Sequence, residues 1–407
     1  MKVNLALCVC LALLILGIPL AAYGLTSHPE EGRGGMPSQP LSSSAAISGG
    51  EASELLEGSK ESKKTEKQRE EGESLTVRDV PANTRPQASQ SGEDTLPVLV
   101  PSSSAMAEGE PVSVTLPDSD SFTIYDLTTG ELHTLTAEEY TVCAVSAEMP
   151  PTFSEEALKA QAVACYTYAL RAKYDNARQP DPALNGADFA ADPSDWKGYV
   201  TREQYLERYG EETGAVYWDT IEQAVKPVLG YVMLYRENPI VAAYHSTCGG
   251  MTEDASNVWQ GSAPYLVPVE SVGDQYAPNY ETAELFSPEE LKEAFAMVGL
   301  MEDSDFSGEP SEWFGDFERS SSGYVTALTL CGEQLDGIDV RGALGLRSSN
   351  FTVEYINGSF LFRVCGYGHG VGMSQYGAEY LGKKGEDWKD ILRHYYTGIT
   401  IAKLNQF

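Results

Sequence analysis

Hydrophobic and polar positions divide this 407-residue chain into three parts. No residue from 3 to 25 is charged, and this run is long enough to span a bilayer as a helix, which takes about 20 apolar residues. Residues 26–117 are rich in Ser, Glu, Gly and Pro and lack aromatic residues, so they cannot bury enough apolar surface to fold. We therefore expect a transmembrane anchor (1–25), a disordered acidic tether (26–117) and one folded domain (118–407). A cleaved signal peptide is the alternative to the anchor.

The folded domain mixes strand-like and helix-like segments in irregular order. Alternating residues predict a β-hairpin over 122–136, and Asn357-Gly358 predicts a turn between two strands over 351–365. Further strands are expected at 230–235, 240–244, 324–331 and 399–404, and helices at 221–225, 378–384 and 388–396, with loop and short helices over 175–220. This order is typical of a single α+β domain with several hairpins rather than of regular βαβ winding.

The segment from Tyr140 to Lys173 combines the clearest signal for the start of a helix with a candidate catalytic residue, Glu148. Tyr140 to Ala147 is rich in β-branched and apolar residues and predicts a buried strand, which Pro150-Pro151 would end. Ser154 is an expected N-cap, with two glutamates in the first helical turn. The helix that follows should bury one apolar face of mostly small residues: Leu158, Ala162, Cys165, Ala169 and Ala172.

Composition and charge exclude several function classes. The formal net charge is −32 and the pI is near 4.4, so neither a nucleic acid nor an anionic lipid surface is an expected partner. Five cysteines lie in the folded domain without a CxxC pair, so the sequence indicates neither a zinc ribbon nor a dense disulfide framework. We expect no cofactor and no metal.

Three predicted strands each end in a Gly- or Pro-rich corner that carries a polar residue, namely Glu148, His245 and His369. A carboxyl group held at the end of a buried strand would be partly desolvated, which raises its pKa toward the range of a general acid. His369 stands between two glycines, so its ring is expected to be reachable by a ligand. A solvent-facing glutamate and unrelated turns are the plainer interpretation of the same residues.

Three stretches resemble the stage II sporulation protein D family: YTVCAVSAEMPPTFSEEALKAQAVACYTYALR, YHSTCGG and GYGHGVGMSQYGAEYL. The resemblance extends over about residues 122–407. It implies a lytic transglycosylase that cleaves peptidoglycan glycan strands already stripped of their peptides, with Glu148 as the catalytic acid. It also implies a place in the mother-cell membrane facing the forespore septum, with the domain outside the cytoplasm. A cell-wall amidase and a polytopic membrane scaffold protein would be its partners in engulfment.

The chain departs from the family pattern at two places. Tyr166 stands where many members have Arg, so any substrate contact by that Arg is not carried over. Some members bind zinc in the segment after the signature helix, but residues 175–220 contain neither His nor Cys.

A single catalytic carboxyl group suits the implied chemistry. Ordinary glycosidases need two carboxylates. A lytic transglycosylase uses the sugar's own 6-hydroxyl as nucleophile and leaves a 1,6-anhydro end, so one group can serve as acid and then as base. We expect hydrogen bonds to the sugar from Tyr244, His245, Ser246, His369, Ser374, Gln375 and Tyr376.

Three other functions remain open from the sequence. A metallohydrolase could use His245, Cys248 and His369 with Cys143, and a cysteine peptidase could pair Cys248 or Cys365 with His369. A glycan-binding scaffold for an amidase, without catalysis of its own, is the third.

Overall fold

The computed structural model describes residues 119–407 apart from 196–197, 260–262 and 405–407. The expected anchor (1–25) and tether (26–117) lie outside these residues. Among the helices of the described part, none is long and apolar enough to cross a membrane.

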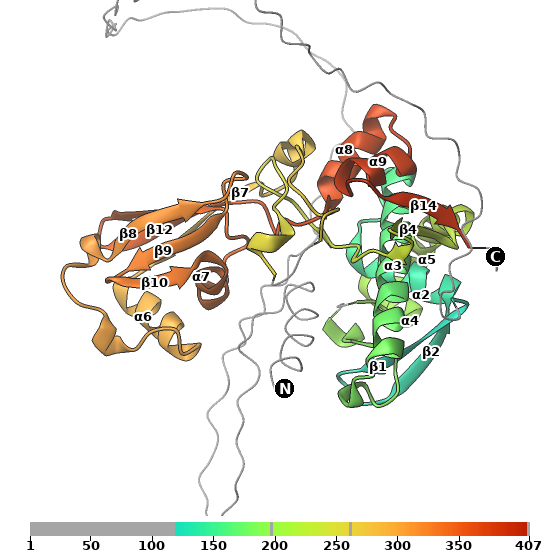
Figure 1. Cartoon of the computed structure of the whole chain (residues 1–407), viewed down its shortest axis with the longest axis horizontal. Coiled ribbons are helices and arrows are strands. Elements are labelled where there is room, and N and C mark those ends of the chain that lie inside the picture. Colours follow the sequence, from blue (N-terminus) through green and yellow to red (C-terminus); the bar gives the residue numbers. More distant parts are fainter. Residues whose placement is uncertain (1–118, 196–197, 260–262, 405–407) are drawn as a thin grey trace, which may run out of the picture. The chain divides into compact units, whose positions relative to one another are not determined.

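Helices and small sheets alternate along the described part, which confirms the expected α+β class (Figure 1). The helices are α2 (Ala137–Glu148), α3 (Glu155–Arg178), α4 (Arg202–Tyr209), α5 (Glu211–Val225), α6 (Pro288–Met297), α7 (Gly337–Leu344), α8 (Gln375–Lys384) and α9 (Trp388–Tyr395). The strands are β1 (Ser121–Asp126), β2 (Leu132–Thr136), β3 (Phe189–Ala191), β4 (Tyr231–Tyr235), β5 (Asn238–Pro239), β6 (Tyr244–His245), β7 (Glu281–Phe286), β8 (Phe314–Arg319), β9 (Val325–Leu330), β10 (Glu333–Asp336), β11 (Phe351–Ile356), β12 (Ser359–Cys365), β13 (Met373–Ser374) and β14 (Thr400–Lys403).

Most of the short-range predictions are confirmed. The β1–β2 and β11–β12 pairs are antiparallel hairpins, and the second turns at Asn357 and Gly358, which both have positive φ. The expected strand over 240–244 is wrong. The chain instead makes two short strands, β5 and β6, because the N–H of Val241 between them donates to the Tyr265 hydroxyl rather than to a strand. Residues 175–220 are more helical than expected, since α5 is 15 residues long.

The segment predicted as a strand over 140–147 is the helix α2, and this prediction is wrong. Nearly every residue from Tyr140 to Ser146 is buried, so the segment has no polar face to reveal a helical period. The start signal was present in the sequence, because Thr136 and Glu139 form a capping box. The Glu139 N–H donates to the Thr136 hydroxyl over 3.2 Å, and the Thr136 N–H donates to the Glu139 carboxylate over 2.9 Å.

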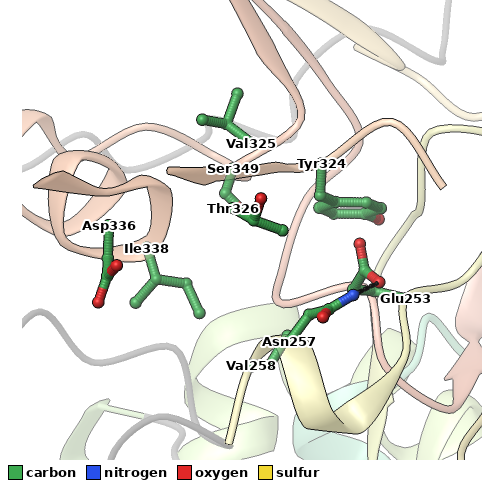
Figure 2. A pocket seen from close by; sticks show the side chains of 9 residues that line it. All are labelled: Glu253, Asn257, Val258, Tyr324, Val325, Thr326, Asp336, Ile338 and Ser349. Carbon is green, nitrogen blue, oxygen red and sulfur yellow. Dashed lines mark hydrogen bonds between the residues drawn. The ribbon is translucent and has the colours of Figure 1, made fainter. Parts of the chain in front are cut away.

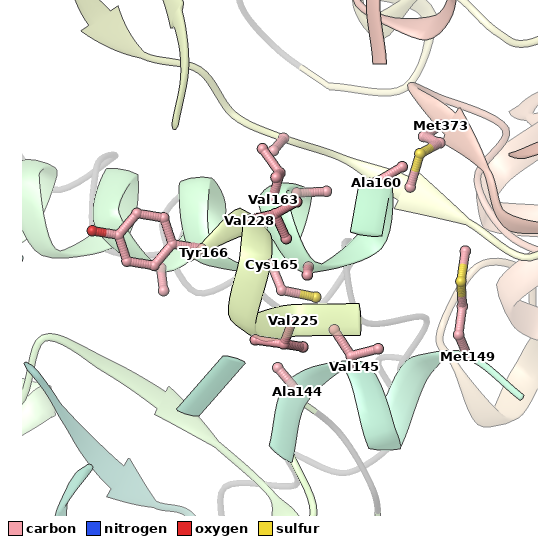
Figure 3. Close-up of a cluster of buried hydrophobic side chains, with 14 of the residues drawn as sticks. Ala144, Val145, Met149, Ala160, Val163, Cys165, Tyr166, Val225, Val228 and Met373 are labelled. Carbon is pink, nitrogen blue, oxygen red and sulfur yellow. The ribbon is translucent and has the colours of Figure 1, made fainter. Parts of the chain in front are cut away.

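The helix α3 begins after Ser154 as predicted, but it is buried on almost all sides rather than on one face. It packs against α2, α5, α8, α9 and β4, and Figure 3 shows its side chains meeting those of α2 and α5. Small residues allow this close packing, because several of them are at most 1% exposed: Ala157, Ala160, Ala162, Ala164, Cys165 and Ala169. Ala172, expected in the buried face, is only half-buried.

The first turns of α3 are also tied to the two C-terminal helices. The Ser154 N–H donates to the carboxylate of Glu379 in α8 over 2.5 Å, while the Ser154 hydroxyl makes no capping bond. Glu156 accepts the N–H of Trp388, the first residue of α9, over 2.9 Å. These bonds satisfy N–H groups that helix starts leave free.

A second hydrophobic cluster lies between the β8–β10 sheet, the β7–β12–β11 sheet and the helices α6 and α7 (Figure 1). Its centre is aromatic, with Trp313 stacked on Phe360 at 5.6 Å between ring centroids. The strand β12 leaves this cluster and leads into the loop 366–372, which we call the glycine loop.

The glycine loop runs against β6 so closely that side chains have no room at alternate positions. A Cβ atom on Gly368 would lie 2.8 Å from the Cβ of His245, and one on Gly372 would lie 2.0 Å from the carbonyl oxygen of Ala243. Both residues also have positive φ, at 116° and 74°. The loop then continues as β13, which pairs in parallel with β6.

We expect Gly372→Ala to cost far more stability than Gly385→Ala. Both positions have positive φ, but a Cβ on Gly385 meets nothing within 4 Å. Backbone strain alone costs about 1–2 kcal/mol, whereas the clash at Gly372 should bring the total above about 4 kcal/mol. Denaturant midpoints of the two variants measure the difference, and equal losses would mean that the glycine loop is not held firmly against β6.

Candidate active site

The predicted catalytic residue Glu148 is the last residue of α2 rather than the end of a strand. Met149 follows in an extended conformation and is 3% exposed, and Pro150 then prevents the helix from continuing. The carboxyl group therefore lies at the C-terminal end of a buried helix, where the helix dipole disfavours a negative charge.

Two side chains from the later motifs contact Glu148. The Gln375 amide, at the start of α8, donates to a Glu148 carboxyl oxygen over a long 3.5 Å, and the Tyr244 hydroxyl in β6 also hydrogen bonds to the carboxyl group. Tyr244 in turn accepts a bond from the Cys165 thiol of α3 over 3.7 Å. The structure thus brings together residues from all three sequence motifs around one carboxyl group.

Burial raises the pKa of Glu148 to about 7, and the bonds from Gln375 and Tyr244 offset this only in part. The surrounding titratable groups stay uncharged at neutral pH, because burial raises the pKa of Cys165 to about 12 and that of Tyr244 well above its usual value. A carboxyl group in this setting is half protonated near pH 7, so it can donate a proton and later accept one.

Apart from His369, which lies in the glycine loop, the other predicted residues lie on or next to the short β6–β13 ladder, in which Ser374 pairs with His245 and Met373 with Tyr244. Successive side chains of a strand point to opposite sides. Tyr244 accordingly reaches Glu148, while His245 and Ser374 lie on the other side. Tyr376 follows β13; its N–H donates to the Ser246 carbonyl over 3.2 Å, and its ring packs edge-on against Phe153 at 5.0 Å.

Burial divides the predicted substrate-binding residues into two groups. Tyr244, Ser246 and Tyr376 are half-buried, so each has surface that a ligand could contact. The remaining four are at most 7% exposed: His245, His369, Ser374 and Gln375. The expectation that the His369 ring is reachable is wrong, because Trp259 packs on it at 5.1 Å and His245 lies 5.7 Å away between ring centroids. The absence of side chains on its glycine neighbours admits other parts of the protein, not solvent.

Asp274 is a buried residue at the site that sequence reasoning missed. It lies in a 3₁₀ helix, η5 (Val272–Tyr276), and is fully buried. One carboxylate oxygen accepts the Cys248 N–H over 2.9 Å and the Cys248 S–H over 2.7 Å, and the other accepts the Ser374 hydroxyl over 2.5 Å. Asp274 therefore joins the second motif to the third. No periodic pattern around this aspartate marks it in the sequence.

The ligands proposed for a metallohydrolase come together only in part. His245 and Cys248 lie with Asp274, and one ligand atom from each is within 4.8 Å of the other two. His369 and Cys143 do not belong to this group of described residues.

Two cavities of the described part are lined by other residues. One of about 160 Å³ lies beside Glu253, Tyr324 and Asp336 (Figure 2). Glu253 there accepts the Asn257 side-chain amide over 2.8 Å, and its N–H donates to the Gly370 carbonyl over 2.8 Å, so it supports the glycine loop. A second cavity of about 680 Å³ is bordered by residues of α2, α4 and α5. Neither is lined by Glu148 or by a predicted substrate-binding residue.

Comparison with known proteins gives concordant matches. Residues 125–235, which include Glu148, match the model of the family described as Stage II sporulation protein. The chain is 32% identical to Stage II sporulation protein D of Bacillus amyloliquefaciens over 285 residues, which is 70% of this chain and 79% of that protein. It is 31% identical to Stage II sporulation protein D of Bacillus subtilis (strain 168) over 292 residues, covering 80% of that protein.

A more distant relative is the protein named Amidase enhancer in Bacillus subtilis (strain 168). It is 26% identical over 302 residues, which cover 63% of this chain but 39% of that protein. The two Stage II sporulation protein D relatives are matched over most of their length, and so the chain belongs to the stage II sporulation protein D family, whose members are sporulation proteins.

Proposed function

We propose that the chain is a peptidoglycan lytic transglycosylase that cleaves peptide-free glycan strands and leaves 1,6-anhydromuramyl ends. The observation that carries the proposal is the setting of Glu148, whose pKa burial raises to about 7. The side chains that hydrogen bond to it, Gln375 and Tyr244, are both uncharged. One carboxyl group that changes protonation state near neutral pH is what this reaction requires.

The reaction needs two proton transfers at Glu148. The protonated carboxyl group gives its proton to the glycosidic oxygen as the bond from that oxygen to C1 breaks. The 6-hydroxyl of the same muramyl residue then attacks C1, and the Glu148 carboxylate takes the hydroxyl proton. Because the nucleophile belongs to the substrate, its effective concentration is high and no second carboxylate is needed to activate water.

The half-buried motif residues Tyr244, Ser246 and Tyr376 are the proposed contacts to the sugar. The buried ones, His245, His369, Ser374 and Gln375, would act by holding the β6–β13 ladder and Glu148 in place.

The cellular setting follows from the proposed substrate. Peptidoglycan lies outside the cytoplasmic membrane, so the domain would act there, anchored by the apolar N-terminal segment. An amidase that removes the peptides and a polytopic membrane scaffold would be its partners in engulfment during endospore formation.

A non-catalytic scaffold that binds glycan and activates a cell-wall amidase is the second candidate. The relative named Amidase enhancer favours it. The two functions differ at Glu148, since a scaffold would stimulate an amidase equally well with and without this carboxyl group.

We expect Glu148→Gln to lower glycan cleavage by about 10²–10⁴, the usual effect of removing a general acid. Mass spectrometry of products from peptide-free glycan, with 1,6-anhydromuramyl ends as the readout, measures the loss. Glu386→Gln is the matched control because Glu386 is exposed in the loop between α8 and α9. Cleavage by folded Glu148→Gln at the rate of the control would remove Glu148 from the mechanism.

The pH dependence of kcat/KM should report the same group. The reacting form is the protonated acid, so kcat/KM should fall about tenfold per pH unit once the pH exceeds the Glu148 pKa of about 7. A profile measured from pH 5 to 9 locates this limb. A fall that begins near pH 4.5, the ordinary value for a glutamate, would show that burial does not set the active form.

Stability should depend on pH through the same carboxyl group, with a definite sign. The folded pKa of about 7 exceeds the ordinary 4.5, so the folded state binds this proton more tightly and loses stability as pH rises from about 4.5 to 7. Glu148→Gln removes that cost. Relative to wild type, its free energy of unfolding should be about 1–3 kcal/mol higher, meaning a more stable variant, at pH 8 than at pH 4. The Glu386→Gln control corrects for the general effect of losing one charge, and an equal difference at both pH values would contradict the expectation.

A further inference from the structure

Behind the β6–β13 ladder, on the side away from Glu148, lies a buried group of three potential metal ligands. His245 comes from β6, Cys248 from the turn that follows it, and Asp274 from η5. Their exposed fractions are 4%, 0% and 0%. One ligand atom of each lies within 4.8 Å of the other two.

The orientation of His245 leaves one ring nitrogen available for a ligand. Its Nδ1 lies 3.1 Å from the Val371 carbonyl oxygen, which can only accept a hydrogen bond. Nδ1 must therefore carry the hydrogen, and Nε2 carries the lone pair. Nε2 is buried and has no hydrogen-bond partner among the described residues. Histidines that bind metals are commonly fixed in this way, by a bond from the other ring nitrogen to a carbonyl.

A network of hydrogen bonds alone explains only two of the three side chains. Asp274 accepts the Cys248 S–H over 2.7 Å and also the Ser374 hydroxyl, so both residues have partners without a metal. The same network leaves the buried Nε2 of His245 unsatisfied, which destabilises the folded chain. A cation bound through Nε2 together with the other two side chains would satisfy it.

The donor set favours zinc over other divalent cations. Thiolate and imidazole are zinc ligands, whereas magnesium and calcium prefer oxygen ligands throughout. Thiolate and carboxylate together carry two negative charges, which a divalent cation neutralises, and buried charges require such compensation. Ligand atoms around a tetrahedral zinc are about 3.5 Å apart, given bonds of about 2.0–2.3 Å, so small side-chain movements would complete the geometry.

We propose that His245, Cys248 and Asp274 bind one zinc ion, with a water molecule as the fourth ligand. On binding, the Cys248 thiol releases its proton to solvent and zinc replaces that proton between sulfur and carboxylate. The site departs from the absence of a metal expected from the sequence, and it is separate from the segment 175–220.

The zinc would stabilise the ladder rather than take part in glycan chemistry. His245 is adjacent to Tyr244, and Ser374, bonded to Asp274, is adjacent to Gln375. These neighbours are the two side chains that hydrogen bond to Glu148. The inference stands on the geometry of the three ligands and holds whether or not the chain cleaves glycan.

Metal binding by the purified 407-residue chain tests the proposal directly. After dialysis against a chelator, the chain is titrated with Zn²⁺ and, separately, with Co²⁺, whose thiolate charge-transfer absorption reports a Co–S bond. We expect about one equivalent of either metal and a thiolate band with Co²⁺. Cys248→Ser and Asp274→Asn should each weaken binding by at least tenfold, and Cys248→Ser should abolish the band.

Cys331→Ser is the matched control, because this half-buried cysteine lies outside the group. It should bind metal like wild type. No stoichiometric metal in the wild-type chain, or a cobalt complex without a thiolate band, would overturn the site even if the variants failed to fold. Binding that survives Cys248→Ser unchanged would be adventitious and would also overturn it. None of these readouts depends on glycan cleavage, so failure here is distinguishable from failure of the proposed transglycosylase.

Discussion

The close packing around α3 is the constraint on which the site depends. Its alanines keep α2 and α8 within contact of the same helix, and neither neighbour could approach as closely if α3 carried large side chains there. Gly382 of α8 shows how little space is left at this contact, since a Cβ atom on it would lie 2.3 Å from the Ser154 hydroxyl oxygen. Because α2 ends at Glu148 and α8 begins at Gln375, docking both on α3 brings these two side chains together although 227 positions separate them.

The same packing makes the carboxyl group costly to ionise. Glu148 faces the hydroxyl of Tyr244 and lies near the Tyr140 and Cys165 side chains, all of them uncharged at neutral pH because burial raises their pKa values. Among the neighbours in the described part of the chain, none supplies a positive charge to the carboxylate. A lysine or arginine beside Glu148, or an amide side chain in place of Glu148, would make the folded state more stable at neutral pH. The desolvated acid is stable enough because the large hydrophobic cluster around α3 offsets its cost.

Local signals predicted local structure well, and burial caused the failures. The Asn357-Gly358 turn and the start of α3 at Ser154 depend on residues close in sequence, and both are where the sequence placed them. The sequence of α2 predicts a strand because burial on all sides removes the polar face that distinguishes a helix from a strand. The His369 ring was expected to be accessible because its neighbours are glycines, yet only the fold decides whether solvent or Trp259 occupies the space beside a glycine. Asp274 could not be predicted, since its partners are 26 and 100 positions away.

The β6–β13 ladder explains why the two later motifs contain so many buried polar residues. Alternation along an extended strand sends Tyr244 to one side and His245 to the other. One side of the ladder meets the carboxyl group, and the other meets Asp274, which bonds to residues of both motifs. Ser374 is 0% exposed, so it can affect the site only through its neighbours, such as Gln375 beside it and Ser246, whose carbonyl accepts its hydroxyl. The polar residues of these motifs therefore divide into those that contact the Glu148 carboxyl group and those that hold the first kind in place, and only burial in the folded chain separates the two.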